Sequence, residues 1–252
     1  MIQIFSHPYR KYPLISIIIP THNCSDVLAG AINSVTQQYY QQWELIIVDG
    51  GSSDGTLEII KNYQDHISQW VSEPDGGIYD AMNKGVKVAK GDWIYFLGAD
   101  DILVNILHKI SPQLRNSNRI YYGNVYMPNK NIFYDGKFSA NKLMNKNICH
   151  QAIFYPRTVF EKYEYSLKYP RGGDWDLNMR LWGDPSYKFS YLPFLIAIFS
   201  DIKICRDDWD NYRDLKFEKD RIMLAHMYMG RQLKRSDFLD GIKKKFVSFW
   251  YQ

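Results

Sequence analysis

In the first hundred residues, continuous apolar runs alternate with segments whose apolar residues recur every three or four positions. Continuous β-branched runs are typical of strands buried on both faces of a parallel sheet, and the three-to-four spacing is typical of one buried face of a helix. The pattern predicts strands and helices in strict alternation. The strands are expected at 14–20, 43–51, 70–75 and 92–101, and the helices at 21–38, 52–67 and 77–91.

The pattern changes beyond residue 112 into short, aromatic, strand-like pieces separated by turn residues. Such pieces predict mixed or antiparallel structure that completes the sheet. Helical spacing returns at 174–182, a last pair of strands is expected within 186–199, and the chain from Asp207 onward is predicted to be helical and charged. The strand-like pieces are 119–127, 131–138 and 150–160.

Together these elements predict an α/β fold with a Rossmann-like, doubly wound, mostly parallel sheet, an antiparallel portion and a helical C-terminal tail. Ligands of such sheets bind at the carboxyl edge of the strands. We expect one domain over residues 1–202, with halves of about 14–110 and 111–202, followed by a basic extension over 203–252.

The net charge of +4 comes from the tail, because residues 203–252 hold 12 Lys and Arg against 8 Asp and Glu. A neutral main domain argues against nucleic acid as a partner. The tail ends in Lys243–Lys245 beside Phe246, Phe249, Trp250 and Tyr251, a composition suited to an anionic membrane surface. Packing of those aromatic residues on the core, as an ordinary C-terminal helix, is the alternative.

The location expected from the sequence is cytoplasmic, and the tail adds a peripheral position at the inner face of the cell membrane. No apolar run approaches the length of a membrane span, and the first residues lack the apolar core of a secretory signal. The three cysteines lack CxxC spacing, so neither a zinc site nor a disulfide framework is predicted and a reducing compartment fits best.

Acidic residues stand at the ends of several predicted strands: Asp49, Asp75, and the adjacent pair Asp100 and Asp101. Asp174 lies in a later acidic segment, GGDWDL. Carboxylates are costly to gather in one crevice unless a cation or a hydrogen-bonding ligand compensates them. A hard divalent cation, Mg2+ or Mn2+, is the natural candidate.

Each acidic segment also has a purely structural interpretation. Asp100 and Asp101 suit the start of a helix over 102–110, where they would cap free N–H groups. Asp49 with the glycines after it resembles a nucleotide-contacting turn, and an ordinary strand-to-helix turn is the alternative. Asp174 is equally suited to capping the helix that follows it.

Four segments are notable in combination: SIIIPTHN, ELIIVDGGSSDGT, SEPDGGIYDAMNKGVKVAKGDWIYFLGADD and GGDWDL. Together they resemble the family 2 glycosyltransferases, which are inverting enzymes of the GT-A fold that use nucleotide sugars. The resemblance covers about 14–200, and SEPDGGIYDAMNKG resembles the subgroup that builds bacterial capsule, exopolysaccharide or lipopolysaccharide chains. It makes 14–110 the nucleotide-binding half and 111–202 the acceptor half.

The resemblance implies a donor site in which Thr21, Asn23 and Asp49 line the nucleoside pocket. Asp75 and Asn83 would border the nucleotide or the sugar.

Ala99 and Asp100 occupy the family's DxD-type motif, so that Asp100 would bind the metal ion. His150 would reach the donor phosphates or the acceptor, and Asp174 would act as general base on the acceptor hydroxyl. The chain departs from the family pattern at Gly98 and Gly173, which replace the first acid of each motif.

The expected function is metal-dependent transfer of a sugar from a nucleoside-diphosphate sugar, UDP-linked by preference, to a hydroxyl of a bacterial glycan or a lipid-linked acceptor. A sugar nucleotidyltransferase is one alternative, although IIIPTHN lacks the glycine-rich basic loop that such enzymes usually have. A catalytically impaired, nucleotide-binding homologue is the second, because Gly98 and Gly173 are departures from the pattern.

Overall fold

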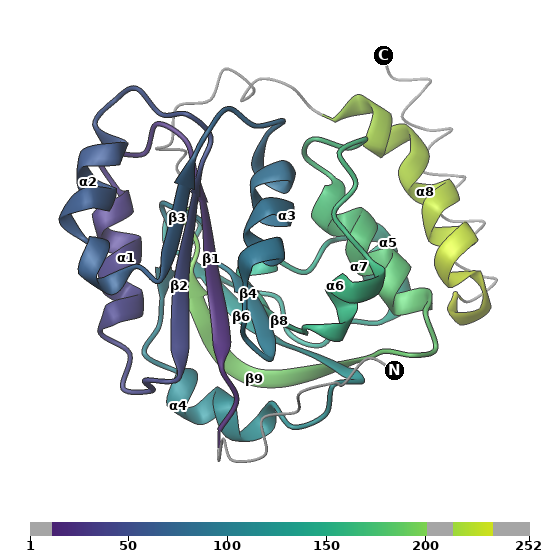
Figure 1. Ribbon diagram of the computed structural model, residues 1–252. Helices are drawn as coiled ribbons and strands as arrows, with labels where there is room; N and C mark the ends of the chain where they lie inside the picture. Colours follow the sequence, from purple (N-terminus) through teal and green to yellow (C-terminus); the bar gives the residue numbers. More distant parts are fainter. Residues whose placement is uncertain (1–11, 201–213, 234–252) are drawn as a thin grey trace, which may run out of the picture.

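The computed structural model of the chain describes residues 12–200 and 214–233. Within these residues one sheet of nine strands runs through the molecule, with helices on both of its faces (Figure 1). The α/β class predicted from the alternating pattern is confirmed.

Four parallel strands form the N-terminal half of the sheet. β1 (Ile15–Thr21) lies between β2 (Trp43–Asp49) and β4 (Trp93–Phe96), and β3 (Gln69–Ser72) pairs with the outer side of β2. Each of these pairs is parallel. All seven residues of β1 are buried, which explains its continuous apolar run.

The second half of the sheet is mostly antiparallel. β8 (Ile153–Pro156) pairs antiparallel with β4, and β6 (Arg119–Met127) pairs antiparallel with β8 but parallel with β9 (Lys188–Ile198). β7 (Ile132–Tyr134) and β5 (Ile102–Leu103) pair antiparallel with β6 and β9 respectively. The strand order is β3-β2-β1-β4-β8-β6-β9-β5, with β7 beside β6. The expected antiparallel portion is thus confirmed.

Two hydrophobic cores form, one on each face of the sheet, because successive strand residues point to opposite faces. Ile17 of β1 packs in the core that contains Leu28 of α1, whereas Ile18 packs with Met82 of α3. Figure 1 shows α1 and α2 on one side of the sheet and α3 with α5–α8 on the other. The α-helices are α1 (Leu28–Thr36), α2 (Thr56–Asn62), α3 (Ile78–Val88), α4 (Leu107–Ile110), α5 (Ala140–Asn145), α6 (Thr158–Lys162), α7 (Gly173–Gly183) and α8 (Leu215–Met229), and short 3-10 helices lie at Gln64–His66, Ser111–Gln113, His150–Ala152 and Gly230–Gln232.

Two local predictions are wrong. The helix expected over 102–110 begins as a strand, because Ile102 and Leu103 pair with Ile198 and Ala197 of β9, and Asp100 and Asp101 therefore do not cap a helix there. The pair of strands expected within 186–199 is the single strand β9.

The described part of the C-terminal extension is helical, as predicted. α8 packs against α7, the helix that begins at Gly173. Residues 203–213 and 234–252, which include Lys243–Lys245, lie outside the described residues, and the boundary at residue 202 stays a prediction. Among the helices that the structure describes, none has the length and apolar character required to cross a membrane.

Cys24 is disulfide-bonded, so the expectation of a chain without disulfides is wrong. Cys149 is a free thiol, and burial raises its pKa above the usual range. Because disulfides persist mainly in oxidising compartments, the cysteines no longer support a reducing one. The cytoplasmic location stays a prediction.

Candidate active site

Three parallel strands end level with one another at the carboxyl edge of the sheet. Thr21 at the end of β1 lies beside Asp49 at the end of β2, and Asp49 lies beside Ser72 at the end of β3. β4 runs parallel on the other side of β1 and ends at Phe96, so the loop that carries Asp100 leaves the same edge. This edge is where parallel α/β sheets bind ligands.

Asp49 is fully buried and organises the loop that follows it. Its Oδ2 accepts hydrogen bonds from the Ser72 hydroxyl (2.6 Å) and from the backbone N–H groups of Gly51 (3.1 Å) and Ser52 (3.0 Å), and its Oδ1 accepts from the Ser52 hydroxyl. Gly51 has a φ of +85°, which favours glycine. Of the two carboxylate oxygens, only Oδ1 keeps a lone pair that a ligand could use. Most of the hydrogen-bonding capacity of Asp49 therefore serves to fix the loop.

Asn23 ties the loop after β1 to the loop after β2. Its Oδ1 accepts from the Ser53 N–H (3.0 Å), and its backbone N–H donates to the Ser52 hydroxyl (2.8 Å). The neighbouring Thr21 hydroxyl oxygen is buried and has no hydrogen-bond partner within the described residues. A buried polar atom of this kind calls for a partner, which a bound ligand can supply.

Asp75 lies against this loop, since a Cβ placed on Gly50 would be 3.0 Å from Asp75 Oδ2. Its Oδ1 accepts a 2.8 Å hydrogen bond from the Gly77 N–H, and burial raises the pKa of Asp75 above its usual value. The loops after β1, β2 and β3 therefore converge, as the sequence predicts for Thr21, Asn23, Asp49 and Asp75.

Asn83 holds α3 to the segment around Tyr165. Its Nδ2 donates to the Tyr165 carbonyl oxygen and its Oδ1 accepts from the Tyr165 N–H, each at 2.9 Å. Both polar atoms of the side chain are thus used to fasten α3 to the segment around Tyr165. The place of Asn83 at the border of the nucleotide or the sugar stays a prediction.

Asp100 and Asp101, the two adjacent acids after β4, differ in burial. Asp101 is buried, and its oxygens accept from Gln151 Nε2 (2.7 Å) and from the Ser200 N–H (2.8 Å). Burial, together with the neighbouring Asp100, raises the pKa of Asp101 to about 6. Asp100 is half-buried, whereas the Ala99 side chain packs in the core and leaves only backbone for a ligand. Asp100 is the carboxylate that this loop can present.

Gly98 is a glycine because Asp101 occupies its side-chain space. A Cβ at position 98 would overlap Asp101 Oδ2 and lie 3.2 Å from Asp100 Oδ1. A first acid of the DxD type at this position is therefore incompatible with the buried carboxylate of Asp101.

Asp174 lies in the first turn of α7 and collects hydrogen bonds from three segments. Its Oδ1 accepts from the Tyr79 hydroxyl and from the Trp175 N–H, and its Oδ2 accepts from Asn147 Nδ2, each at 2.8 Å. His150 Nδ1 lies 3.5 Å from the same Oδ2. The Asp174 side chain keeps 13% of its exposure, so this network borders the surface.

Gly173 is a glycine for the same kind of reason as Gly98. A Cβ there would lie 2.7 Å from the Tyr79 ring, which is buried and stacks on Tyr165 at 5.3 Å. The Tyr79 ring thus fills the space that an acid at position 173 would need, and the Tyr79 hydroxyl is hydrogen-bonded to Asp174. At both departures from the family pattern, a neighbouring side chain accounts for the glycine.

Residues 147–151 link the two acidic centres. Asn147 and His150 face Asp174, whereas Gln151 donates to Asp101. Asn147 is itself held by Asn178 of α7 through a 2.9 Å hydrogen bond. The segment therefore brings His150 between the loop after β4 and the start of α7.

The model of the family described as "Glycosyl transferase family 2" matches residues 16–168. The chain belongs to glycosyltransferase family 2. This membership decides against the sugar nucleotidyltransferase alternative.

Curated relatives agree with the family. The chain is 37% identical over 198 residues to a PGL/p-HBAD biosynthesis glycosyltransferase of Mycobacterium tuberculosis, covering 75% of this chain and 77% of the relative. It is 35% identical over 162 residues to the Escherichia coli enzyme named UDP-Glc:alpha-D-GlcNAc-diphosphoundecaprenol beta-1,3-glucosyltransferase WfgD, covering 60% and 64%.

Solved structures show the same fold. S. aureus TarS 1–349 in complex with UDP matches with a TM-score of 0.65 at 14% identity, covering 93% of this chain and 72% of that one, whereas the match to a longer TarS chain covers only 36% of it. The mannosyltransferase PcManGT from Pyrobaculum calidifontis, in complex with GDP-Man and Mn2+, matches with a TM-score of 0.64 at 16% identity, covering 90% and 66%. The GT-A fold of this glycosyltransferase is thereby confirmed.

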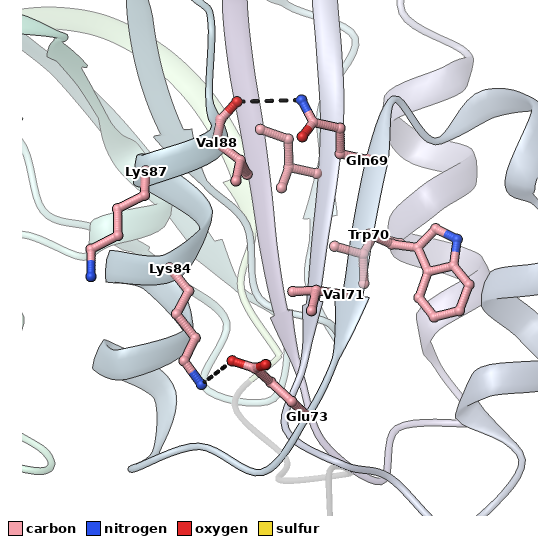
Figure 2. A pocket seen from close by; sticks show the side chains of 9 residues that line it. Gln69, Trp70, Val71, Glu73, Lys84, Lys87 and Val88 are labelled. Atoms are coloured by element: carbon pink, nitrogen blue, oxygen red, sulfur yellow. Dashed lines mark hydrogen bonds and ion pairs between the residues drawn. The ribbon is translucent and has the colours of Figure 1, made fainter.

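A groove on the glycosyltransferase lies between β3 and α3, and one of its lining residues, Glu73, donates its backbone N–H to the Asp49 carbonyl oxygen (3.0 Å). Figure 2 shows Gln69 and Val71 of β3 on the side that faces α3, whereas Trp70 points away from α3. Gln69 donates to the Val88 carbonyl oxygen, and Lys84 pairs with Glu73 at 2.9 Å. None of the predicted site residues lines it. The groove therefore adjoins the candidate active site without including its predicted residues.

Several contributors to the site were not predicted. Ser72 lies on a neighbouring strand, Asn147 lies between short elements, and Tyr79 contacts Asp174, which is 95 positions later in the sequence. Tyr79 lies in the GIYDAMNKG stretch that carries part of the family resemblance. Local spacing gives no signal for any of these pairings.

Proposed function

We propose that this glycosyltransferase moves a sugar from a UDP-sugar, with inversion at the anomeric carbon, to a hydroxyl of a lipid-linked or growing bacterial surface glycan. The level ending of β1, β2 and β3 at Thr21, Asp49 and Ser72 carries the proposal, because it offers a nucleoside diphosphate one polar edge beside Asp100. The UDP-Glc and diphosphoundecaprenol in the name of WfgD and the UDP bound to TarS support the donor and acceptor classes.

The residues present fit a divalent cation that is shared with the donor. The described residues contain no group of three or more His, Cys, Asp or Glu arranged to hold a metal ion. Asp100 would therefore hold Mg2+ or Mn2+ together with the two donor phosphates, as is common for these ions. When bound, the ion would neutralise charge on the departing nucleoside diphosphate.

Inversion in a single displacement needs a group that removes the acceptor proton on the face opposite the leaving phosphate. Asp174 supplies the carboxylate for this task at the acceptor side. Its hydrogen bonds from Tyr79, Trp175 and Asn147 fix its orientation. The steric reasons for Gly98 and Gly173 support an active enzyme over an impaired homologue.

Calorimetry with UDP, GDP and ADP, each with and without Mn2+, tests the donor class. UDP should bind best in the presence of Mn2+. Asp100→Ala should lose the Mn2+-dependent part of that affinity, and Asp174→Asn should bind UDP normally but transfer no sugar. Asp65→Asn, on an exposed 3-10 helix, is the matched control and should behave as wild type.

Two results would contradict the proposal. If no nucleoside diphosphate binds, the nucleotide-sugar function is wrong. If NMR of the product shows retained anomeric configuration, the inverting mechanism is wrong.

A further inference from the structure

The hairpin formed by β6 and β7 exposes large apolar side chains to solvent. Phe133 keeps 68% of its exposure and Ile132 keeps 41%, and all six residues from 128 to 133 are exposed. Phe133 lies opposite Tyr126 across the two strands, with 5.0 Å between the ring centroids. Single exposed apolar side chains are ordinary on a protein surface, whereas adjacent ones mark an interaction surface.

The hairpin leaves the sheet at the edge that carries the candidate active site. β8 runs antiparallel to β4, and β6 runs antiparallel to β8, so β6 ends at the same edge as β4 and β1. The Tyr134 hydroxyl donates a 2.7 Å hydrogen bond to the Asn147 carbonyl oxygen, and Asn147 donates to Asp174. At a rise of about 3.3 Å per strand residue, the turn of the hairpin lies about 10–15 Å beyond Tyr134.

The hairpin also lies in a basic part of the chain. From the turn of the hairpin through Lys146, the sequence holds four lysines and a single acid, Asp135. Asp135 is already paired with Lys142 (3.4 Å) and Lys146 (2.5 Å). Lys130 in the turn and Lys137 after β7 are exposed. The surface around Phe133 therefore has an excess of positive charge.

Apolar side chains and positive charge together indicate the kind of partner. A second protein chain could pair with the edge of β7, but three residues offer few main-chain hydrogen bonds for such pairing. An anionic lipid surface matches both properties. Its headgroup region takes up aromatic and aliphatic side chains, and its phosphates attract lysines.

We propose that the β6–β7 hairpin is a membrane contact, in which Phe133 and Ile132 enter the headgroup region of an anionic bilayer and the nearby lysines meet lipid phosphates. This inference rests on the proposed function, because the contact would present a lipid-linked acceptor at the edge that carries Asp174. It uses different residues from the contact predicted for the C-terminal extension.

Vesicle flotation with the full-length protein tests the contact. The probes are vesicles of phosphatidylcholine alone and of phosphatidylcholine mixed equally with phosphatidylglycerol. Wild type should bind the mixed vesicles, and binding should weaken as salt is added. Phe133→Ser should lower the affinity about tenfold, and Lys137→Glu about fivefold. Both side chains are exposed, so Tm should not change.

Tyr39→Ser and Lys90→Glu are the matched controls. Both side chains are exposed and lie at the opposite edge of the sheet, in the segments that lead into the starts of β2 and β4. Both variants should bind the mixed vesicles as wild type does.

A transfer assay connects the contact to the acceptor. UDP-glucose and UDP-GlcNAc are the donors, and polyprenyl-diphosphate-linked GlcNAc is the acceptor probe, either embedded in the mixed vesicles or dispersed in detergent. Phe133→Ser should lose about tenfold in rate with the embedded acceptor and keep the wild-type rate with the dispersed one.

The outcomes separate this inference from the proposed function. If wild type transfers no sugar with either donor to either form of the acceptor, the proposed function is wrong, and flotation still tests the contact. Wild-type flotation of Phe133→Ser, or equal losses in the two control variants, would overturn the membrane contact. So would a concentration-dependent dimer that Phe133→Ser abolishes, if wild type does not bind the vesicles.

Discussion

The hydroxyl of Tyr79 donates a 2.8 Å hydrogen bond to Asp174 Oδ1, and its ring fills the space that a side chain at position 173 would need. Burial raises the pKa of Tyr79 well above its usual value, so the hydroxyl stays protonated and acts as the donor. One residue of α3 therefore both orients Asp174 and explains the glycine before it.

Removal of this hydroxyl in Tyr79→Phe should lower kcat about tenfold, because hydrogen bonds to charged groups contribute about 1.5–3 kcal/mol. UDP affinity should not change. Steady-state kinetics and calorimetry measure both quantities. Tyr165→Phe is the control, since it removes the hydroxyl of the ring that stacks on Tyr79, whereas the Tyr79 hydroxyl is the one that donates to Asp174. Equal losses in both variants would contradict the role of Tyr79.

Thr21→Val should weaken UDP binding without destabilising the fold. The Thr21 hydroxyl oxygen is buried and makes no hydrogen bond with the residues that the structure describes. Its replacement by a methyl group removes an unsatisfied polar atom from the protein but leaves the ligand without a partner. We expect Kd to rise about fivefold, which corresponds to ~1 kcal/mol for one hydrogen bond, with Tm unchanged or higher. Unchanged Kd would remove Thr21 from the donor site.

Gly98→Ala should destabilise the protein by about 1–3 kcal/mol, because the added Cβ overlaps Asp101 Oδ2 in a tightly packed turn. Gly98→Asp, which restores the acid of the family pattern, should be worse. Urea unfolding monitored by fluorescence measures the change. Gly230→Ala serves as control, since a Cβ there meets no atom within 4 Å and the backbone φ is −51°. Wild-type stability in Gly98→Ala would show that the Asp101 carboxylate can move aside.

Asp184 at the C-terminal end of α7 should make stability fall in acid. Burial opposes its charge, but hydrogen bonds from Lys162 (2.6 Å), the Ser186 N–H (2.8 Å) and Tyr163 (2.7 Å) outweigh burial and hold the pKa of Asp184 well below its unfolded value of 3.8. A lowered pKa means that the stabilisation is complete above that value and is lost as pH falls below it.

Asp184→Asn should therefore cost about 1–3 kcal/mol at neutral pH and progressively less below pH 3.8. Thermal unfolding at a series of pH values tests this, with Asp65→Asn as an exposed control. A difference from wild type that stays constant with pH would contradict the mechanism.

Sequence patterns predicted the strands whose residues are buried along a continuous stretch of the chain. β1, β2 and β4 are buried along nearly their whole length, so their apolar runs identify them. The prediction of a helix over 102–110 was wrong at its start, because Ile102 and Leu103 pair with β9. β9 lies about 95 positions later in the sequence, and the local spacing of apolar residues does not indicate so distant a pairing.

The same limit applies to the site. Thr21, Asp49 and Asp100 could be placed at one edge because parallel strands end there. The sequence also indicated Asp100, rather than Asp101, as the metal ligand, but the contacts of Gln151 and Ser200 with Asp101 come from distant parts of the chain and could not be predicted. The exclusion of a side chain at Gly173 depends likewise on a ring from α3.

Residues 147–151 have a consequence for enzyme engineering. Because this short segment contacts Asp101 at one end and Asp174 at the other, it sets the spacing between the loop after β4 and the start of α7. A chimaera that exchanges the C-terminal half between relatives must transfer residues 147–151 together with α7. The residue at position 151 must also remain able to donate a hydrogen bond to the acid that follows β4. Even a one-residue insertion between Asn147 and Gln151 would place the two reacting partners out of line.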